Sequence, residues 1–525
     1  MLDLTPFLKL YARRRARRLA RLDPVAAQQA QLAQLLTEAG ATRFGRDHDF
    51  GAIRTPADFK RAVPLRKYDD FWRDYWRAEF PVLDDVSWPR RMPFFAVTSG
   101  TTSDATKYIP VSHAMVRANK RAALDLLVHH IANRPATRLF GGPNFILGGS
   151  TDLTARAPGI YSGDLSGIAI KTMPWWARPR SFPPLDLALI ADWENKVDVL
   201  AKAAQGLDIR SVGGTPSWLL ILFDRMAALR GPGRGGGRLP LHEFWPNLEL
   251  IVHGGVHFGP YKSQFDALLA GSHAETREGY AASEGFVAIQ DRGPGEGMRL
   301  NLDNGLFFEF VPVEELGAAN PTRHWIGDAE LDVNYAIAVT SCAGLWAYLV
   351  GDTVRLVSRD PPRLLVTGRT AYSLSAFGEH LIGEEIEEAV SRAADGIGAA
   401  VADYSVGAVF PAAAGDLGGH LYVVEFAGTA PSEGARAAFA AAVDKYLLDK
   451  NDDYAGHRSG GFGMKAPEIL VMKPGGFAAW MKARGRYGGQ NKVPRIINDP
   501  ALFAGLREHA RHFPSSGGRG DLTQT

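Results

Sequence analysis

Short apolar runs alternate with amphipathic helical patterns through the first two thirds of the chain. Residues 92–97 and 108–111 have the pattern of short buried strands, and a helix is predicted to begin after an N-cap at Ser112. In this helix the apolar residues recur at steps of three to five and so predict a buried face: Met115, Ala118, Ala122, Leu126 and Ile131. The residues expected to stay in water are Lys120, Arg121 and Asp125. The alternation predicts an α/β domain with a helix-covered sheet.

Several of the predicted strands end at polar residues. Residues 248–252 lead into His253-Gly-Gly-Val256, where two glycines would let a ligand approach the backbone. Residues 277–290 and 338–356 repeat the layout of an apolar run followed by a polar cluster. Because open α/β sheets bind ligands at strand ends, these clusters are candidate site residues. The glycine-rich segment 231–237 follows a helical pattern and is expected to be a surface loop.

The pattern changes near residue 372. An acidic helix with Glu384, Glu385, Glu387 and Glu388 is followed by two strands, at residues 404–410 and 420–426, and by an alanine-rich helix after Ser432. We therefore predict a large N-terminal domain at residues 1–371 and a smaller α+β domain at 372–525, with a hinge near 370–375 and a disordered tail from about 515.

Composition and charge narrow the function classes. The 525 residues are 46% hydrophobic and 22% charged, and the formal charge is +2, so no overall field would recruit nucleic acid. A single cysteine, Cys342, excludes an intramolecular disulfide framework and a cysteine-rich metal site. No apolar run reaches the length of a spanning helix. The expectation is a cytoplasmic protein without integral membrane contact and without nucleic acid as a partner; its oligomeric state stays open.

One local charge anomaly lies near the N-terminus. Between residues 11 and 22, six arginines alternate with Ala and Leu in a helix-compatible pattern. Such a helix is suited to contact acidic lipid or RNA. The interpretation we favour from sequence is a terminal helix whose arginines stay solvated, while its larger apolar side chains pack on the body: Phe7, Leu8, Tyr11 and Leu19.

The segment Thr98-Ser-Gly-Thr-Thr-Ser-Asp-Ala-Thr-Lys107 concentrates hydroxyls, a glycine and a lysine between two predicted strands. Backbone N–H groups near Gly100, the hydroxyls of Thr98, Ser99, Thr101 and Thr102, and the Lys107 ammonium suit the oxygens of a nucleoside triphosphate. A Ser/Thr-rich surface turn is the alternative, and for this stretch alone it is the more frequent outcome.

Three further clusters carry candidate chemistry: Tyr280-Ala-Ala-Ser-Glu284, Tyr348-Leu-Val-Gly-Asp352 with Gly368-Arg369, and Gly488-Gly-Gln-Asn-Lys492. Glu284 at a strand end suits Mg²⁺, which takes one or two protein carboxylates when phosphates supply other ligands. Asp352 suits the two ribose hydroxyls, and Arg369 could add donors. Taken singly, Glu284 and Lys492 would be solvated surface residues, and Asp352 and Arg369 a surface ion pair.

The order of these motifs resembles the adenylate-forming superfamily of acyl-CoA synthetases, adenylation domains and luciferases. Three details resemble the auxin-responsive promoter (Gretchen Hagen) family of acyl-acid amido synthetases within it. Lys107 is followed by Tyr-Ile-Pro110, the block 340–348 runs into Gly351-Asp352, and Lys492 lies in Gln-Asn-Lys-Val-Pro-Arg495. The resemblance extends from about Phe44 to Arg495. It implies a large luciferase-like α/β domain and a small mobile C-terminal domain.

The resemblance also implies an activity: ATP-dependent adenylation of a small carboxylic acid, then attack by an amino acid, with ATP and Mg²⁺ required. Catalytic roles would fall to Lys492, Glu284 and Lys107, with Glu284 on the magnesium. The residues implied to contact ATP or AMP are Ser99, Gly100, Thr101, Thr102, Gly255, Val256, Tyr280, Ser283, Asp352 and Arg369. Lys492 would reach the phosphates by rotation of the small domain.

Three departures from the family pattern bear on this expectation. Asp104 replaces a usual glycine and adds negative charge near the expected triphosphate, Leu349 stands where the family has arginine in Tyr-Arg-x-Gly-Asp, and Ala282 stands where it has the first serine of Ser-Ser-Glu. An acyl-CoA ligase is the alternative enzyme class, and Asp104 motivates a second alternative, a non-catalytic relative that binds an acid or nucleotide. The acid is not named by the sequence; four aromatic residues are pocket candidates and equally core candidates: Trp175, Trp176, Trp218 and Phe286.

Overall fold

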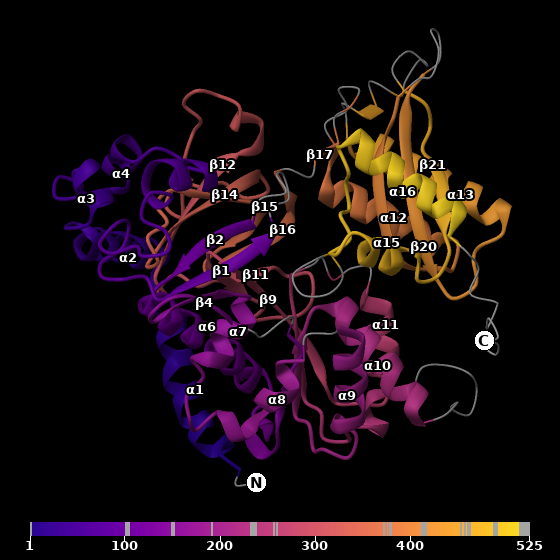
Figure 1. Cartoon of the computed structure of the whole chain (residues 1–525), viewed down its shortest axis with the longest axis horizontal. Coiled ribbons are helices and arrows are strands. Elements are labelled where there is room, and N and C mark those ends of the chain that lie inside the picture. The colour runs from indigo at the N-terminus through magenta and orange to yellow at the C-terminus, as the bar shows by residue number, and fades with distance from the viewer. Residues whose placement is uncertain are drawn as a thin grey trace, which may run out of the picture. The chain divides into compact units, whose positions relative to one another are not determined.

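The computed structural model describes residues 3–99, 106–148, 153–190, 193–230, 239–255, 258, 261–370, 373–374, 376, 381–410, 417–451, 454–455, 458, 464–486 and 492–513. The chain divides into two compact units, residues 1–366 and 367–525 (Figure 1). The larger unit holds the α/β pattern expected from the first part of the sequence, and the smaller one holds the predicted α+β elements.

Unit 1 is built on a large mixed sheet. Among the described residues it has twelve strands in the order β13-β12-β14-β15-β16-β11-β10-β9-β8-β7-β3-β6. The strands at one end run parallel, with β3 beside β6 and β7, β7 beside β8, and β8 beside β9. Beyond β9 the pairing is antiparallel for β9 with β10, β10 with β11, β11 with β16, and β14 with both β12 and β15. Sheet bounds are β3 Asn144–Ile146, β6 Ser181–Phe182, β7 Ser211–Gly214, β8 Leu250–His253, β9 Glu275–Ala282, β10 Gly285–Ile289, β11 Met298–Leu300, β12 Leu306–Pro312, β13 His324–Trp325, β14 Asn334–Ser341, β15 Tyr348–Arg359 and β16 Pro362–Arg369.

A second sheet in unit 1 carries the candidate phosphate hairpin. Its described strands are in the order β2-β1-β5-β4, with bounds β1 Phe94–Ser99, β2 Thr106–Val111, β4 Leu153–Ala157 and β5 Ile160–Gly163. β1 and β2 are antiparallel and in register from Phe94 opposite Val111 to Ser99 opposite Thr106. The predicted strands on both sides of the serine- and threonine-rich loop are therefore confirmed.

Helices cover the sheets of unit 1 (Figure 1). The helical bounds are α1 Thr5–Ala20, α2 Pro24–Ala39, α3 Arg43–Asp47, α4 Pro56–Ala62, α5 Tyr68–Phe71, α6 His113–Asn133, α7 Leu165–Lys171, α8 Leu185–Ala188, α9 Trp193–Ala204, α10 Pro216–Arg230 and α11 Lys262–Leu268. The Ser112 hydroxyl accepts from the Met115 backbone N–H, which confirms the predicted N-cap of α6. Every residue of the predicted apolar face of α6 is buried.

Two expectations about α1 and α6 are wrong. Asp125 of α6 is buried, and so is Arg15 of α1, because the two side chains bind each other across the helix pair. Asp303 accepts from the outer nitrogens of the same guanidinium. This pairing turns the stripe of α1 that contains Arg15 inward. As a result Phe7 is 72% exposed and Tyr11 39% exposed, although both were expected to pack on the body.

Unit 2 is a three-stranded sheet with helices on both faces. Its order is β19-β20-β21, with β20 pairing antiparallel to β19 and parallel to β21. Alternate residues of β20 face opposite ways: Tyr422 and Val424 join one core with α12 and α13, whereas Leu421 and Val423 join another with α15 and α16. The bounds are β17 Ser373–Leu374, β18 Leu381–Ile382, α12 Gly383–Gly396, β19 Ala400–Val409, β20 Gly419–Ala427, α13 Glu433–Lys450, β21 Glu468–Met472, α15 Gly476–Ala483 and α16 Pro500–His512. The acidic helix, the two strands and the helix after Ser432 are confirmed.

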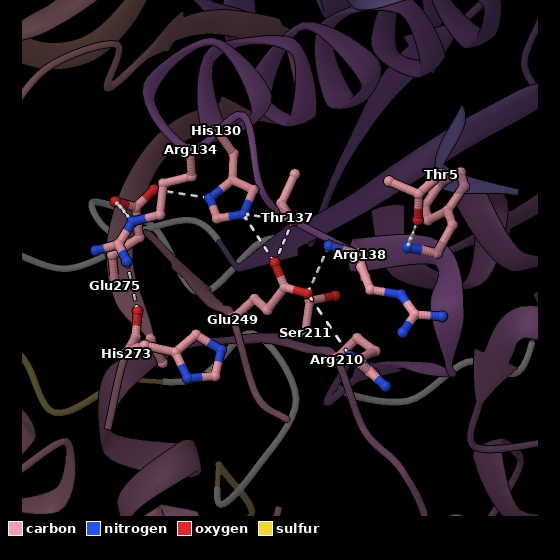
Figure 2. A network of polar contacts seen from close by, with 12 residues as sticks. Thr5, His130, Arg134, Thr137, Arg138, Arg210, Ser211, Glu249, His273 and Glu275 are labelled. Carbon is pink, nitrogen blue, oxygen red and sulfur yellow. Dashed lines mark hydrogen bonds and ion pairs between the residues drawn. The ribbon is translucent and has the colours of Figure 1, made fainter. Parts of the chain in front are cut away.

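A buried polar cluster closes the amino ends of the parallel strands in unit 1 (Figure 2). We call it the amino-end cluster; it comprises His130, Arg134, Thr137, Glu249, Glu275 and Arg277. The His130 ring is fully buried, and its Nδ1 lies 2.7 Å from Glu275 Oε1. Glu275 also accepts from Arg134 at 2.9 Å and from Arg277 at 2.7 Å. Glu249 accepts from the Thr137 hydroxyl and, at 2.8 Å, from the Arg138 backbone N–H.

The charges of the amino-end cluster shift its pKa values in opposite directions. Burial alone would lower the pKa of His130, but hydrogen bonds to Glu249 and Glu275 outweigh it and raise that pKa. The pKa of Glu275 falls to about 2 although burial opposes the change, because His130 and the neighbouring arginines favour its charged form. The cluster is thus a set of charges that pair with one another inside the fold. Across the described part of the chain, no helix is long and apolar enough to cross a membrane.

Candidate active site

The carboxyl ends of β8 and β9 and the start of β15 bring several of the predicted residues together. The Tyr280 hydroxyl on β9 donates to Asp352 Oδ2 on β15 at 2.5 Å. Both side chains are nearly buried, at 9% and 8% exposure. Two residues that lie 72 positions apart in the chain and were predicted to contact the nucleotide base and ribose are therefore direct neighbours.

A backbone irregularity places Asp352 where it is. β14 and β15 pair at Ala336 with Thr353 and again at Ala338 with Leu349, so β15 carries extra residues between these two points. Gly351 lies in this bulge with φ of 93°, a conformation that glycine adopts at little cost. Bulges reorient side chains and are frequent beside active sites. The Gly-Asp motif is thus a local device that turns the Asp352 carboxylate out of the regular ladder toward Tyr280.

Glu284 lies in the tight turn between β9 and β10, and its carboxylate is hydrogen-bonded to the Tyr348 hydroxyl. Burial, followed by the nearby Glu284 charge, raises the pKa of Tyr348 well above its usual value. The phenol is therefore neutral and donates its proton to the Glu284 carboxylate. The described residues contain no group of three or more acidic, His or Cys side chains that would hold a metal by themselves. Glu284 alone fits a metal that takes its other ligands from phosphates and water.

Residues 340–347, which precede Tyr348 and belong to a motif noted in the sequence, are buried and hold Tyr348 in place. The Trp346 indole donates to the Ser87 carbonyl at 2.9 Å, and the Ala347 backbone N–H donates to Thr340 Oγ1 at 2.9 Å. The Ser112 hydroxyl at the start of α6 donates to the Cys342 carbonyl at 2.5 Å. These bonds fix the loop between β14 and β15, so that Tyr348 begins β15 at a defined position.

Lys107 reaches the same neighbourhood from β2. Its Nζ lies 5.7 Å from the centre of the Tyr68 ring, and the Tyr68 hydroxyl accepts from the Tyr108 backbone N–H at 3.0 Å. Burial is the main cause that raises the pKa of Tyr68 to about 12. Tyr68 in turn contributes to the raised pKa of Tyr348, which is bonded to Glu284. Lys107, Tyr68, Tyr348 and Glu284 therefore form one continuous set of neighbours.

The end of β8 approaches β9 closely beside Tyr280. A side chain at Gly254 would place its Cβ 2.2 Å from the Gly279 carbonyl oxygen, so only glycine fits there. His253, one residue earlier, is stacked on the Phe258 ring at 3.8 Å, and burial lowers its pKa to about 3. It is thus neutral at the strand end. Gly255 follows with φ of 80°, and Val256 lies outside the described residues.

Other predicted residues are placed only in part. Gly100, Thr101, Thr102 and Asp104 lie outside the described residues, and the strand β1 places the backbone of Ser99. Ser283 is half-buried in the turn that carries Glu284. The backbone of Arg369 ends β16, and Lys492 is exposed in unit 2. The glycine-rich segment 231–237, the hinge at 371 and 372 and the tail from 514 also lie outside the described residues.

The pocket candidates chosen as aromatic residues differ widely in exposure. Trp175 is 81% exposed and Trp176 is 40% exposed, whereas Phe286 is half-buried against the core shared by α1 and α6. Two tyrosines that matter for the geometry, Tyr68 and Tyr348, were given no role by sequence reasoning. Tyr348 is the first residue of the Tyr-x-x-Gly-Asp motif, so its role could have been predicted from sequence. Tyr68 lies outside any motif, and only its contacts in the structure identify it.

Comparisons with known proteins all point to the same family. Models of the GH3 family N-terminal, central and C-terminal domains match residues 18–274, 300–369 and 384–501 in that order. Indole-3-acetic acid-amido synthetase GH3.8 of Oryza sativa subsp. indica is 28% identical over 295 residues, which is 51% of this chain and 47% of the relative. Jasmonoyl--L-amino acid synthetase GH3.5 of Oryza sativa subsp. japonica is 26% identical over 48% of this chain and 46% of its own length. The chain thus matches about half the length of these curated relatives.

Solved structures agree on the fold. The GH3.15 acyl acid amido synthetase superposes with a TM-score of 0.71 at 17% identity and covers 92% of this chain and 93% of its own. The 2-hydroxyisobutyryl-CoA ligase in the postadenylation state superposes with a TM-score of 0.60 at 15% identity, over 93% and 92% of the two chains. The large α/β domain and smaller C-terminal domain expected from the sequence are confirmed. With its three domain models in order along most of the sequence, the chain belongs to the GH3 family.

Proposed function

We propose that this protein is an acyl-acid amido synthetase: it uses ATP to adenylate a carboxylic acid and transfers the acyl group to the amine of an amino acid. The observation that carries the proposal is the convergence of three separate segments, which carry Tyr280 and Glu284, Asp352, and Lys107. The names of the curated relatives, an indole-3-acetic acid-amido synthetase and a jasmonoyl-amino acid synthetase, support the second half-reaction.

The Tyr280–Asp352 pair suits the nucleoside. A carboxylate has acceptor capacity for both ribose hydroxyls beyond the bond it takes from Tyr280. The Tyr280 hydroxyl fixes the orientation of that carboxylate, so less entropy is lost when the ribose binds. The end of β8, where glycine allows close approach, lies beside β9 and suits the adenine. Arg369 would add donors at the ribose.

The Glu284 carboxylate and the Lys107 ammonium suit the phosphates. Attack of a carboxylate on the α-phosphorus breaks the bond from the α-phosphorus to the bridging oxygen and releases pyrophosphate. It brings negative groups together, so the barrier falls when cations and N–H donors are placed where charge accumulates. Magnesium, bound by Glu284 and by phosphate oxygens, would supply part of that positive charge. Tyr348 holds the Glu284 carboxylate in position through its hydroxyl. Lys107 supplies a fixed positive charge at the root of the hairpin.

The acyl transfer follows from adenylation. Once the acid is joined to AMP, an amino acid amine attacks the acyl carbon, the carbon–oxygen bond to AMP breaks, and the amine loses a proton. Lys492 of unit 2 is proposed to act on the phosphates during adenylation, and unit 2 to rotate between the two half-reactions. Replacement of Lys492 by Ala would then slow adenylation more than transfer from a preformed acyl-adenylate.

The test is a screen of carboxylic acids against amino acids, read by mass spectrometry for amides and by AMP release. The expected result is AMP release that requires ATP, an acid and an amino acid together, with the amide formed in equal amount. Coenzyme A in place of the amino acid is the matched control. Thioester formed with coenzyme A, and no amide, would instead make the protein an acyl-CoA ligase. No pyrophosphate exchange with any acid that binds would make it a non-catalytic relative.

A further inference from the structure

The helix α1 presents an exposed ridge that the proposed chemistry does not use. We call it the α1 ridge; it comprises Phe7, Leu10, Arg14, Arg17 and Arg21. These residues are spaced by three and four positions, so they lie along one side of the helix, opposite the buried stripe of Leu8, Ala12, Arg15 and Leu19. Phe7 is 72% exposed and Leu10 is 53% exposed. α1 packs against α6 on the outside of the large unit (Figure 1).

The charged residues of this helix and its flanks are closely spaced and all basic. Residues 4–22 hold seven of the chain's 59 basic residues and no Asp or Glu, which leaves 52 basic residues against 57 acidic ones elsewhere. The chain is therefore a slightly acidic body with a strongly basic helix on its surface. An average charge of +2 hides this asymmetry.

The acids around α1 are already engaged. Asp125 and Asp303 both bind the guanidinium of Arg15, in two bidentate pairs with distances of 2.6 to 2.8 Å. Arg18 lies 3.8 Å from Asp303 and is 70% exposed. Among the described residues, no ion pair engages Arg13, Arg14, Arg17 or Arg21. The burial of Arg15 thus anchors the helix to the body and leaves Arg13, Arg14, Arg17 and Arg21 exposed to an external anionic surface.

We propose that the α1 ridge docks the protein on an anionic lipid surface. Apolar side chains in the first two turns would enter the boundary between headgroups and acyl chains, and the arginines that follow would meet the anionic headgroups. The aliphatic Leu10 beside the aromatic Phe7 fits insertion into lipid better than base stacking. A second copy of the chain is a poor occupant, because a two-fold interface through this ridge would bring like charges together.

The position of α1 leaves the candidate active site open. The helix begins beside the amino ends of the parallel strands, where the Thr5 hydroxyl accepts from the Phe140 backbone N–H at 3.0 Å (Figure 2). Gly255 and Tyr280, which are proposed to bind ATP, lie at the opposite, carboxyl ends of β8 and β9. Docking through α1 would therefore hold the protein at a membrane without covering its substrates.

The experiment is flotation of the full chain with vesicles of phosphatidylcholine alone and of phosphatidylcholine mixed with phosphatidylglycerol. We expect binding only with the anionic lipid and a decrease as salt is raised. The variant Arg14→Gln/Arg17→Gln/Arg21→Gln should weaken the partition by on the order of a hundredfold. The variant Phe7→Ser/Leu10→Ser should weaken it at every salt concentration. All five side chains are exposed, so both variants are expected to fold.

The matched control removes the same charge from exposed arginines on other elements: Arg54→Gln/Arg77→Gln/Arg359→Gln. It should bind vesicles as the unsubstituted chain does. Absence of binding, equal binding to both vesicle types, or an equal loss in the control overturns the proposal. So does RNA that binds through the same arginines while vesicles do not, or a dimer that the Phe7→Ser/Leu10→Ser variant abolishes.

Discussion

The two edges of the parallel strands in unit 1 hold their carboxylates in different ways. At the amino ends, Glu275 lies between an imidazole and two guanidinium groups, and its charge is neutralised within the fold. At the carboxyl ends, Asp352 and Glu284 each accept from a tyrosine hydroxyl, a donor that carries no charge of its own. Ion pairs that satisfy one another stabilise a fold. A charge held in position by neutral donors is suited to a ligand.

Replacement of Glu284 should have the largest effect on the proposed site at the carboxyl ends of the strands. The change Glu284→Gln keeps the shape but removes the charge proposed to hold magnesium, and pyrophosphate exchange should fall by about a hundredfold to a thousandfold. Exchange is measured with saturating acid and ATP. The control Glu314→Gln removes an exposed carboxylate elsewhere in unit 1 and should leave exchange unchanged. Exchange within a factor of three of the unsubstituted protein would remove Glu284 from the mechanism.

Replacement of Glu275 tests the amino edge. Glu275→Gln leaves His130 and two arginines facing a neutral amide, and breaking a buried ion pair in this way should cost about 3 kcal/mol in the free energy of unfolding. The measurement is urea denaturation, with Glu314→Gln again as control. Pyrophosphate exchange per folded molecule should not change. If Glu275→Gln lost pyrophosphate exchange without a change in the free energy of unfolding, the amino-end cluster would take part in catalysis. The two ends of the strands would then not differ in role.

Replacement of Tyr280 should have a smaller effect that is confined to nucleotide binding. Tyr280→Phe removes the hydrogen bond to Asp352, worth about 1 kcal/mol, so the KM for ATP should rise about fivefold with little change in kcat. The comparison variant Tyr161→Phe removes a hydroxyl from β5 and should not alter the KM. A fall in kcat with constant KM would contradict a role at the ribose.

The pH dependence of stability should carry the signature of His130. Its folded pKa is raised, so its stabilising contribution is complete below the unfolded value of about 6.5 and is lost as pH rises through the folded pKa. Urea denaturation from pH 6 to pH 9 should therefore show a decline that the variant His130→Gln lacks. Equal slopes for the two proteins would show that His130 is not charged in the fold.

Local pattern was enough to predict much of the fold. The hairpin of β1 and β2, the N-cap at Ser112 and four elements of unit 2 (α12, β19, β20 and α13) follow from periodicity and turn chemistry over a few residues. The buried face of α6 follows for the same reason. These features depend on neighbours in sequence, which the sequence displays directly.

Contacts between distant residues were beyond that reasoning. α1 has apolar residues at positions 7, 8, 10 and 11, which allow more than one buried face, and the pairing of Arg15 with Asp125, 110 residues away, selects the face. The same holds for Asp125, which its position on α6 marked as solvated. In the site, the motifs named Tyr280 and Asp352, but the bond between them and the part played by Tyr68 required coordinates.

A crystal structure of the full chain with a non-hydrolysable ATP analogue and Mg²⁺ tests the proposed site most directly. We expect the ribose on Asp352, the base beside Tyr280 and the end of β8, and the metal between Glu284 and the phosphates. A nucleotide bound elsewhere, with the Tyr280–Asp352 and Glu284–Tyr348 pairs untouched, would contradict it.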